Sequence, residues 1–92
     1  MTTLTLIGKP DCHLCDVADE IVDLVVGELP EQVADGLVIE RASILEDLVL
    51  YDLWWEKVPV VLIDGDLHTH WRLSADRLRA ALLEADQEGT PA

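Results

Sequence analysis

The chain has 92 residues, half of them apolar, and its 19 acidic and 6 basic side chains give a formal charge of -13. This composition predicts one small, soluble domain over residues 1–92, with no run near the ~18–20 apolar residues that a membrane helix needs. The charge excludes nucleic acid and anionic membrane surfaces as partners, because both would repel such an acidic protein.

The first half of the chain predicts a strand, a helix, a second strand and a second helix. Residues 3–7 alternate like a strand, and Gly8, Lys9 and Pro10 then break the pattern. Asp11 is the expected N-cap of a helix over about 12–26. Its expected core face consists of Leu14, Val17, Ile21, Leu24 and Val25. A connector over 28–36, either irregular or with a helical turn, a strand over 37–41 after a parallel crossover, and a helix over 44–55 follow.

The second half predicts a hairpin and a last helix. Residues 58–63 form a β-branched run typical of a central strand, which the Asp64-Gly65 turn signal ends. The alternation through Trp71 predicts an antiparallel partner strand. Ser74 is expected to cap the last helix, and residues 89–92 to form a frayed tail. We expect Trp54 and Trp55 to pack against the core or rim it, and Trp71 to pack in the core or hairpin.

Two cysteines lie at the predicted start of the first helix, in the run Cys12-His13-Leu14-Cys15. Residues 1–7 lack the basic segment and the long apolar run of a secretory signal, so we expect a cytoplasmic protein. In a reducing compartment a cysteine pair is more often catalytic or metal-binding than a structural disulfide. Residues spaced by three on a helix share a face, so the two sulfur atoms can reach disulfide distance.

The position of Cys12 favours its thiolate form. Free N–H groups and the helix dipole stabilise an anion at a helix N-terminus, and Lys9 adds a positive charge nearby. Asp11 and Asp16 oppose this effect, yet we expect the Cys12 pKa to lie below the free value of about 8.5. His13, between the cysteines, either favours the thiolate further or is a solvated spacer. We therefore predict that Cys12 is a nucleophile and Cys15 the resolving thiol.

The motif has two further interpretations. Cys12 and Cys15 could form half of a zinc or iron–sulfur site, with His13 as a further ligand, but a closed zinc site needs four ligands. His68 and His70 share one face of the predicted hairpin, which is either solvated or a metal-binding pair. The cysteines could also be incidental to a redox-inactive module that binds a basic protein through its acidic surface.

The run from Gly8 to Cys15, with Val58-Pro59-Val60 and the Asp64-Gly65 turn, resembles the glutaredoxin-like branch of the thioredoxin superfamily over about residues 3–88. The resemblance implies an α/β thioredoxin-like fold of order β-α-β-α-β-β-α, with a four-stranded mixed sheet and three helices. It also implies a cis peptide bond before Pro59. A proline at the start of a central strand is compatible with this, since X-Pro is the linkage in which cis costs least.

The resemblance also implies a substrate site. The backbone of Val58 would pair with an extended substrate segment, and Lys9 matches a lysine that contacts the glutathione glycyl carboxylate in glutaredoxins. The chain differs from the glutathione-binding pattern at Lys57, where threonine is common, and at Leu14, where an aromatic residue is common. It also has Asp64-Gly65-Asp66 where glutaredoxins have a Gly-Gly turn.

We thus predict a monomeric thiol–disulfide oxidoreductase that acts in cell redox homeostasis and holds no bound cofactor or metal. Its expected substrates are protein disulfides or glutathione mixed disulfides, and its reductant is glutathione or a flavoprotein reductase. The catalytic residues are Cys12 and Cys15. The expected substrate-binding residues are Lys9, His13, Lys57, Val58, Pro59, Gly65 and Asp66.

Overall fold

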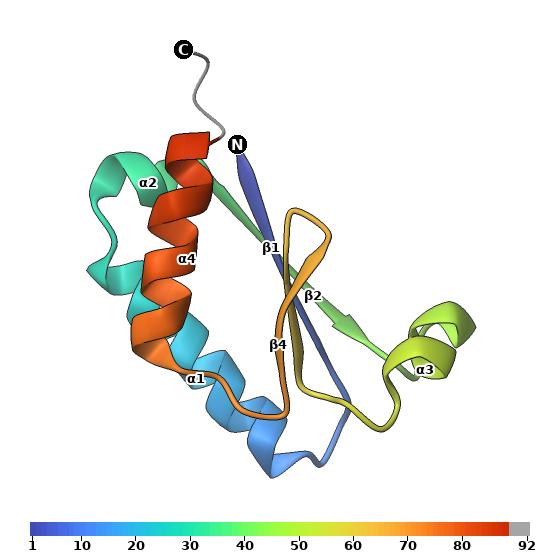
Figure 1. Ribbon diagram of the computed structural model, residues 1–92. Helices are drawn as coiled ribbons and strands as arrows, with labels where there is room; N and C mark the ends of the chain where they lie inside the picture. Colours follow the sequence, from blue (N-terminus) through green and yellow to red (C-terminus); the bar gives the residue numbers. More distant parts are fainter. Residues whose placement is uncertain (89–92) are drawn as a thin grey trace.

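The computed structural model describes residues 1–88, which contain four strands and four helices (Figure 1). The strands are β1 (Thr2–Gly8), β2 (Leu37–Ser43), β3 (Val60–Ile63) and β4 (Asp66–His70). The helices are α1 (His13–Glu28), α2 (Glu31–Asp35), α3 (Leu48–Trp54) and α4 (Ala75–Glu88). The expected frayed tail over residues 89–92 lies outside the described residues.

The strands form one mixed sheet in the order β2-β1-β3-β4. β1 and β2 are parallel, with a register that runs from Thr2 opposite Leu37 to Gly8 opposite Ser43. β3 is antiparallel to both β1 and β4. The predicted four-stranded mixed sheet is therefore confirmed. The helix number differs from the expected three, because the connector holds the one-turn helix α2, which follows Pro30 and ends at Gly36.

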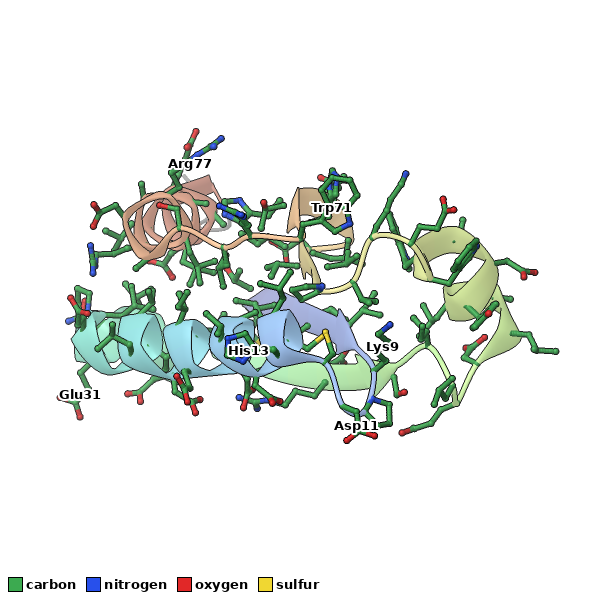
Figure 2. The ribbon with its side chains drawn as sticks, turned by 90° about the horizontal axis from the view of Figure 1, so that it is seen from below. Lys9, Asp11, His13, Glu31, Trp71 and Arg77 are labelled. Atoms are coloured by element: carbon green, nitrogen blue, oxygen red, sulfur yellow. A yellow bond between two sulfur atoms is a disulfide. The ribbon has the colours of Figure 1, made fainter. Side chains whose placement is uncertain are left out.

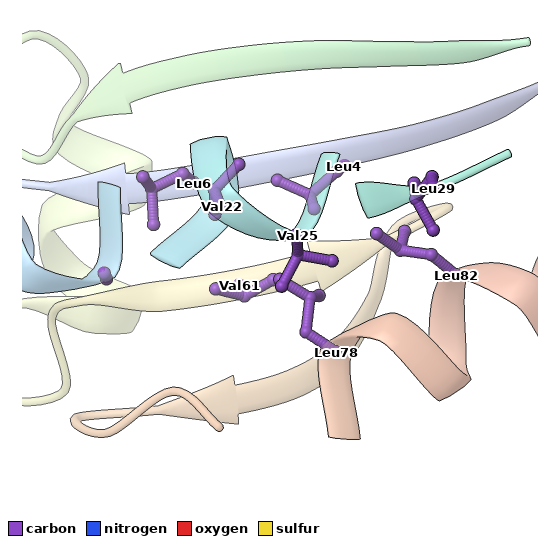
Figure 3. Packing of buried hydrophobic residues seen from close by; sticks show 9 residues of the cluster. Leu4, Leu6, Val22, Val25, Leu29, Val61, Leu78 and Leu82 are labelled. Atoms are coloured by element: carbon purple, nitrogen blue, oxygen red, sulfur yellow. The ribbon is translucent and has the colours of Figure 1, made fainter. Parts of the chain in front are cut away.

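The sheet separates two apolar clusters. Figure 1 shows α1 and α4 side by side on one face, while α3 projects beyond the far end of β2. Successive strand residues point to opposite faces, so Leu6 enters one cluster and Ile7 the other. The larger cluster, seen in Figure 3, contains Leu4, Leu6, Ala18, Val22, Val25, Leu29, Val61, Leu78 and Leu82. The smaller one contains Ile7, Ile44, Val58 and Val60.

The buried stripe of α1 differs from the predicted one. Its fully buried residues are Ala18, Val22 and Val25, whereas Leu14 and Leu24 are exposed. The stripe faces α4 as well as the sheet, and only tertiary packing sets that rotation about the helix axis. The predicted N-cap was also wrong: Asp11 has a φ of 56°, and Cys12 caps the helix.

Two other element boundaries differ from the predictions. The helix expected over 44–55 begins at Leu48, because β2 extends to Ser43 and Asp47 caps the helix by accepting a hydrogen bond from the Val49 N–H at 2.8 Å. Strand β4 ends before Trp71, whose φ of 66° turns the chain away and leaves its ring half exposed, not packed in the core. The Ser74 cap is confirmed by the hydrogen bond from the Arg77 N–H to its hydroxyl.

The tryptophans on and after α3 have different surroundings. Trp54 is partly buried against the smaller cluster, as expected. Trp55 is exposed and stacks on the ring of Tyr51. Within residues 1–88, no helix combines the length and apolar character needed to cross a membrane.

Gly8 ends β1 and lies close to Cys15 in the first turn of α1. A Cβ atom at this position would lie 3.2 Å from the Cys15 Sγ and 3.3 Å from the Cys15 Cβ. Those separations are tighter than ordinary van der Waals contact, so the absence of a side chain at Gly8 lets Cys15 sit against the end of the strand.

We predict that the core packing of α4 carries much of the stability. Leu78→Ala removes a fully buried side chain and should lower the free energy of unfolding by about 2–5 kcal/mol. Leu24→Ala is the matched control, since Leu24 is 57% exposed, and should change it by less than about 0.5 kcal/mol. Urea denaturation of both oxidised variants measures this. Equal losses would contradict the described packing.

We also predict opposite effects at two glycines. Gly8→Val overpacks the contact with Cys15 and should lower the free energy of unfolding by about 1–3 kcal/mol. Gly27→Ala meets no atom within 4 Å and lies in α1, so it should raise that free energy by up to about 1 kcal/mol. Urea denaturation again distinguishes the two. A Gly8→Val protein as stable as the wild type would contradict the close approach.

Candidate functional site

The cysteine pair lies where β1 passes into α1. Residues 9–11 form the intervening loop, and the positive φ of Asp11 turns the chain so that Cys12 becomes the N-cap residue. Cys12 and Cys15 are joined by a disulfide, and their Cα atoms are 5.2 Å apart, within the usual range for such a bond. The spacing-based expectation that the two sulfur atoms can meet is confirmed.

The first turn of α1 directs hydrogen-bond donors toward Cys12. The Cys15 N–H donates to the Cys12 Sγ at 3.2 Å, and the Asp16 N–H donates to the Cys12 carbonyl at 3.1 Å. An anionic sulfur at this position would gain from the N–H groups and from the positive end of the helix dipole. The arrangement therefore suits a thiolate once the disulfide is reduced.

Both cysteines are partly buried, and among the described residues only Cys15 of the two is grouped with an apolar cluster. Cys15 packs against the smaller apolar cluster, which includes Ile7 and Val58. Its sulfur also lies against Gly8, as described above. This side chain therefore links the cysteine pair physically to the loop that precedes β3.

That loop contains a cis peptide bond between Val58 and Pro59, as the family resemblance implied. Both residues are buried. Val58 lies outside the registers that pair β3 with β1 and β4, both of which reach only to Val60. Among the described residues, its backbone thus belongs to neither ladder.

Sequence reasoning missed Trp71. Its backbone N–H donates to the Pro59 carbonyl at 2.9 Å, and its indole N–H donates to the Glu56 carbonyl at 2.7 Å. A left-handed φ is costly for a large residue, so these bonds hold it in place. Trp71 and Leu14 both line a groove of about 280 Å³. In the sequence, Trp71 is one residue of an alternating run, and that pattern does not predict its hydrogen bonds to the segment around Pro59.

The basic residues near the pair are exposed. Figure 2 shows Lys9 and His13 close to the disulfide. The Lys57 Nζ lies 5.9 Å from the centre of the Trp54 ring, in cation–π range. These positions place all three predicted basic residues around the cysteine pair and the Val58–Pro59 loop.

A second groove, of about 360 Å³, is lined in part by Cys15. Lys9, Asp16, Arg41 and Glu46 are among its lining residues. Arg41 donates hydrogen bonds to two carboxylates of α1, and the bond to Asp19 raises the pKa of the guanidinium. Arg41 is paired in this way, whereas Lys9 makes no ion pair within residues 1–88. The acidic residues Asp16 and Glu46 line the same groove.

Two of the predicted substrate-binding residues lie elsewhere. Gly65 and Asp66 form the β3–β4 turn, beside Asp64, whose side chain accepts a hydrogen bond from the Thr3 N–H. Thr3 and the cysteine pair are at opposite ends of β1. The Asp64-Gly65-Asp66 turn is therefore remote from Cys12, because β3 runs antiparallel to β1 and ends beside the start of that strand.

The histidines of β4 form no metal centre within the described chain. Burial and the nearby Arg77 charge lower the pKa of His68. His70 packs edge-on against Trp71. No group of three or more His, Cys, Asp or Glu side chains in residues 1–88 is arranged to hold a metal ion.

Structural comparisons agree with this architecture. A protein from X. campestris, target XcR50, is 30% identical, with a TM-score of 0.65, covering 89% of this chain and 96% of its own. Protein Ne2328 from Nitrosomonas europaea is 21% identical, with a TM-score of 0.69 over 87% of this chain and 89% of its own. A mutant thioredoxin from Halobacterium salinarum shares the fold at 16% identity, with a TM-score of 0.65 over 98% of this chain and 78% of its own.

Sequence comparison gives the family. A comparison with curated proteins finds no match. Residues 3–83 match the family model described as glutaredoxin-like domain (DUF836), which is most of the chain. The cysteine pair at the start of α1 and the cis-proline loop both lie inside this match. The chain therefore belongs to the glutaredoxin-like domain family and has the thioredoxin fold.

Proposed function

We propose that this protein is a thiol–disulfide oxidoreductase that reduces protein disulfides or glutathione mixed disulfides. The observation that carries the proposal is the Cys12–Cys15 pair at the N-terminus of α1, packed beside the Val58–Pro59 loop. A pair that forms a disulfide can alternate between the dithiol and disulfide states, and its location supplies donors for a thiolate.

The catalytic cycle conserves electrons and protons. In the reduced protein, the Cys12 thiolate attacks one sulfur of the substrate disulfide; a Cys12–substrate disulfide forms and the other substrate sulfur leaves as a thiolate. The Cys15 thiolate then attacks the Cys12 sulfur and releases the second substrate thiolate. The leaving thiolates take up protons from water. The substrate gains two electrons, and the cysteine pair loses two as its disulfide re-forms.

A second reductant must return the pair to the dithiol. Two glutathione molecules, or the dithiol of a flavoprotein reductase, would each supply the two electrons. Lys9 and Lys57 support glutathione, because its carboxylates need cations on an otherwise acidic surface. Val58 supports a protein substrate, since its backbone lies outside the sheet ladders and suits an extended segment.

The two cysteines have different surroundings and therefore different expected roles. Cys12 caps the helix end, whereas the Cys15 sulfur packs against Gly8 and the smaller cluster. Attack on an external disulfide requires an accessible sulfur, and resolution requires only that the second sulfur reach the first. Cys12 is thus the nucleophile and Cys15 the resolving thiol.

The cysteine variants test this assignment. Cys12→Ser should lower the reduction rate of both insulin and a glutathione mixed disulfide by more than about 100-fold, because the nucleophile is lost. Cys15→Ser should lose insulin reduction and accumulate a covalent substrate adduct on Cys12, detected by mass spectrometry, while retaining turnover of the glutathione mixed disulfide. Full activity of both variants would defeat the mechanism.

Alkylation against pH tests the thiolate. In the reduced Cys15→Ser protein, the iodoacetamide reaction of Cys12 should show a midpoint below about 8.5, because the thiolate is the reactive form and the helix terminus stabilises it. The same variant in concentrated urea is the control and should titrate near about 8.5. A native midpoint at or above that of the unfolded protein would contradict the role of Cys12.

A further inference from the structure

Helix α3 and its flanks expose an unusual number of apolar side chains. The α3 patch is defined as Leu45, Leu48, Val49, Tyr51, Leu53 and Trp55, all exposed, with Leu48 82% accessible. None of the residues of α3 itself is buried. Single exposed apolar residues are ordinary, but a gathering on one short element is typical of a binding surface.

The helix is nonetheless anchored. Leu50 and Trp54 pack on the smaller apolar cluster, and the Asp47 carboxylate caps the N-terminus. Figures 1 and 2 both show α3 standing out from the rest of the fold, and Figure 1 shows it near the end of β1 that leads into α1. The exposed side chains are thus held outward by a fixed helix.

The patch is continuous with the candidate site. Three residues after α3 comes Lys57, whose N–H donates to the Trp54 carbonyl at 2.8 Å, and then the Val58–Pro59 loop. Val58 shares the smaller cluster with Cys15 as well as with Trp54. A protein that laid a segment on α3 would therefore have a neighbouring segment close to the cysteine pair.

The charges around the α3 patch favour a basic partner. Over residues 44–58 the chain has four carboxylates, Glu46, Asp47, Asp52 and Glu56, and one cation, Lys57. The Tyr51 and Trp55 rings stack with their centres 6.2 Å apart and their planes 10° from parallel. Exposed aromatic faces beside carboxylates suit guanidinium and ammonium groups. A second copy is disfavoured, because it would bring a like patch and a further charge of -13.

We propose that the α3 patch docks a basic, amphipathic segment of the protein whose disulfide is reduced at Cys12. Leucine-like side chains of that segment would cover the apolar residues, and its Arg or Lys side chains would contact Tyr51, Trp55 and the flanking carboxylates. The proposal rests on the proposed oxidoreductase function and names the substrate class: basic proteins rather than acidic ones.

The test uses three synthetic peptides that share one intramolecular disulfide loop. One carries no arm, one carries a Leu/Arg amphipathic arm, and one carries the same arm with Glu in place of Arg. We expect kcat/KM for the Leu/Arg peptide to exceed that for the armless peptide by about 10-fold or more, and the Leu/Glu peptide to gain nothing. Equal values for the two arms would overturn the proposal.

Variants locate the effect. Leu48→Ser with Trp55→Ser should bring the ratio of Leu/Arg to armless kcat/KM close to one, and Asp52→Lys with Glu56→Lys should transfer the preference to the Leu/Glu peptide. The matched control is Leu24→Ser with Leu67→Ser, two exposed leucines on α1 and β4, which should leave the wild-type ratio unchanged. Circular dichroism checks that each variant is folded. A patch variant with the wild-type ratio would overturn the proposal.

The two proposals fail differently. If none of the peptides is reduced by the wild-type protein, the oxidoreductase function fails. If all three are reduced at the same kcat/KM, only the docking proposal fails. Sedimentation of the wild-type protein as a dimer that Leu48→Ser with Trp55→Ser dissociates would assign the patch to a second copy and overturn the basic partner.

Discussion

The contact between Gly8 and Cys15 determines how the reactive end of the molecule is built. β1 pairs with β2 on one side and β3 on the other, so the position of its last residue is well fixed. The missing side chain at Gly8 lets α1 begin directly against that strand end. Cys12 then caps the helix, and its sulfur bonds to the Cys15 sulfur and accepts a hydrogen bond from the Cys15 N–H. The close approach at Gly8 and the N-cap position of Cys12 thus lie within one turn of the helix.

The apolar clusters on the two faces of the sheet differ in their relation to the candidate site: only the smaller one includes Cys15. The larger cluster packs α1 and α4 against one face and contains neither cysteine. The smaller cluster on the other face joins Ile7, Val58, Trp54 and Cys15, so the disulfide, the cis-proline loop and α3 share one apolar support. Substitutions in the smaller cluster are therefore expected to affect the candidate site more directly than substitutions in the larger one.

Charge acts on two length scales. At long range, the net charge of -13 makes the electrostatic potential negative. Two of the six basic side chains, Arg41 and Arg79, are also paired with carboxylates. Lys9 and Lys57 nevertheless lie close to the cysteine pair and the loop before β3. The long-range field favours encounter with basic proteins, whereas the local cations suit a carboxylate at the site itself; salt weakens the first effect more than the second.

The sequence by itself determined the features that depend on near neighbours along the chain: the strand–loop–helix run around Cys12, the strand predicted over 58–63, the Ser74 cap and the family resemblance. The structure begins that strand at Val60, after the cis peptide bond. Only the tertiary structure decided which face of α1 is buried, that Gly65 lies far from Cys12, and that Trp71 lies beside Pro59. Local patterns encode hydrogen bonding and turn preferences, but helix rotation and hairpin direction follow from packing between residues distant in sequence. The exposure of the α3 patch was also decided by the tertiary structure. An apolar run in a sequence predicts burial, but the fold leaves these side chains exposed.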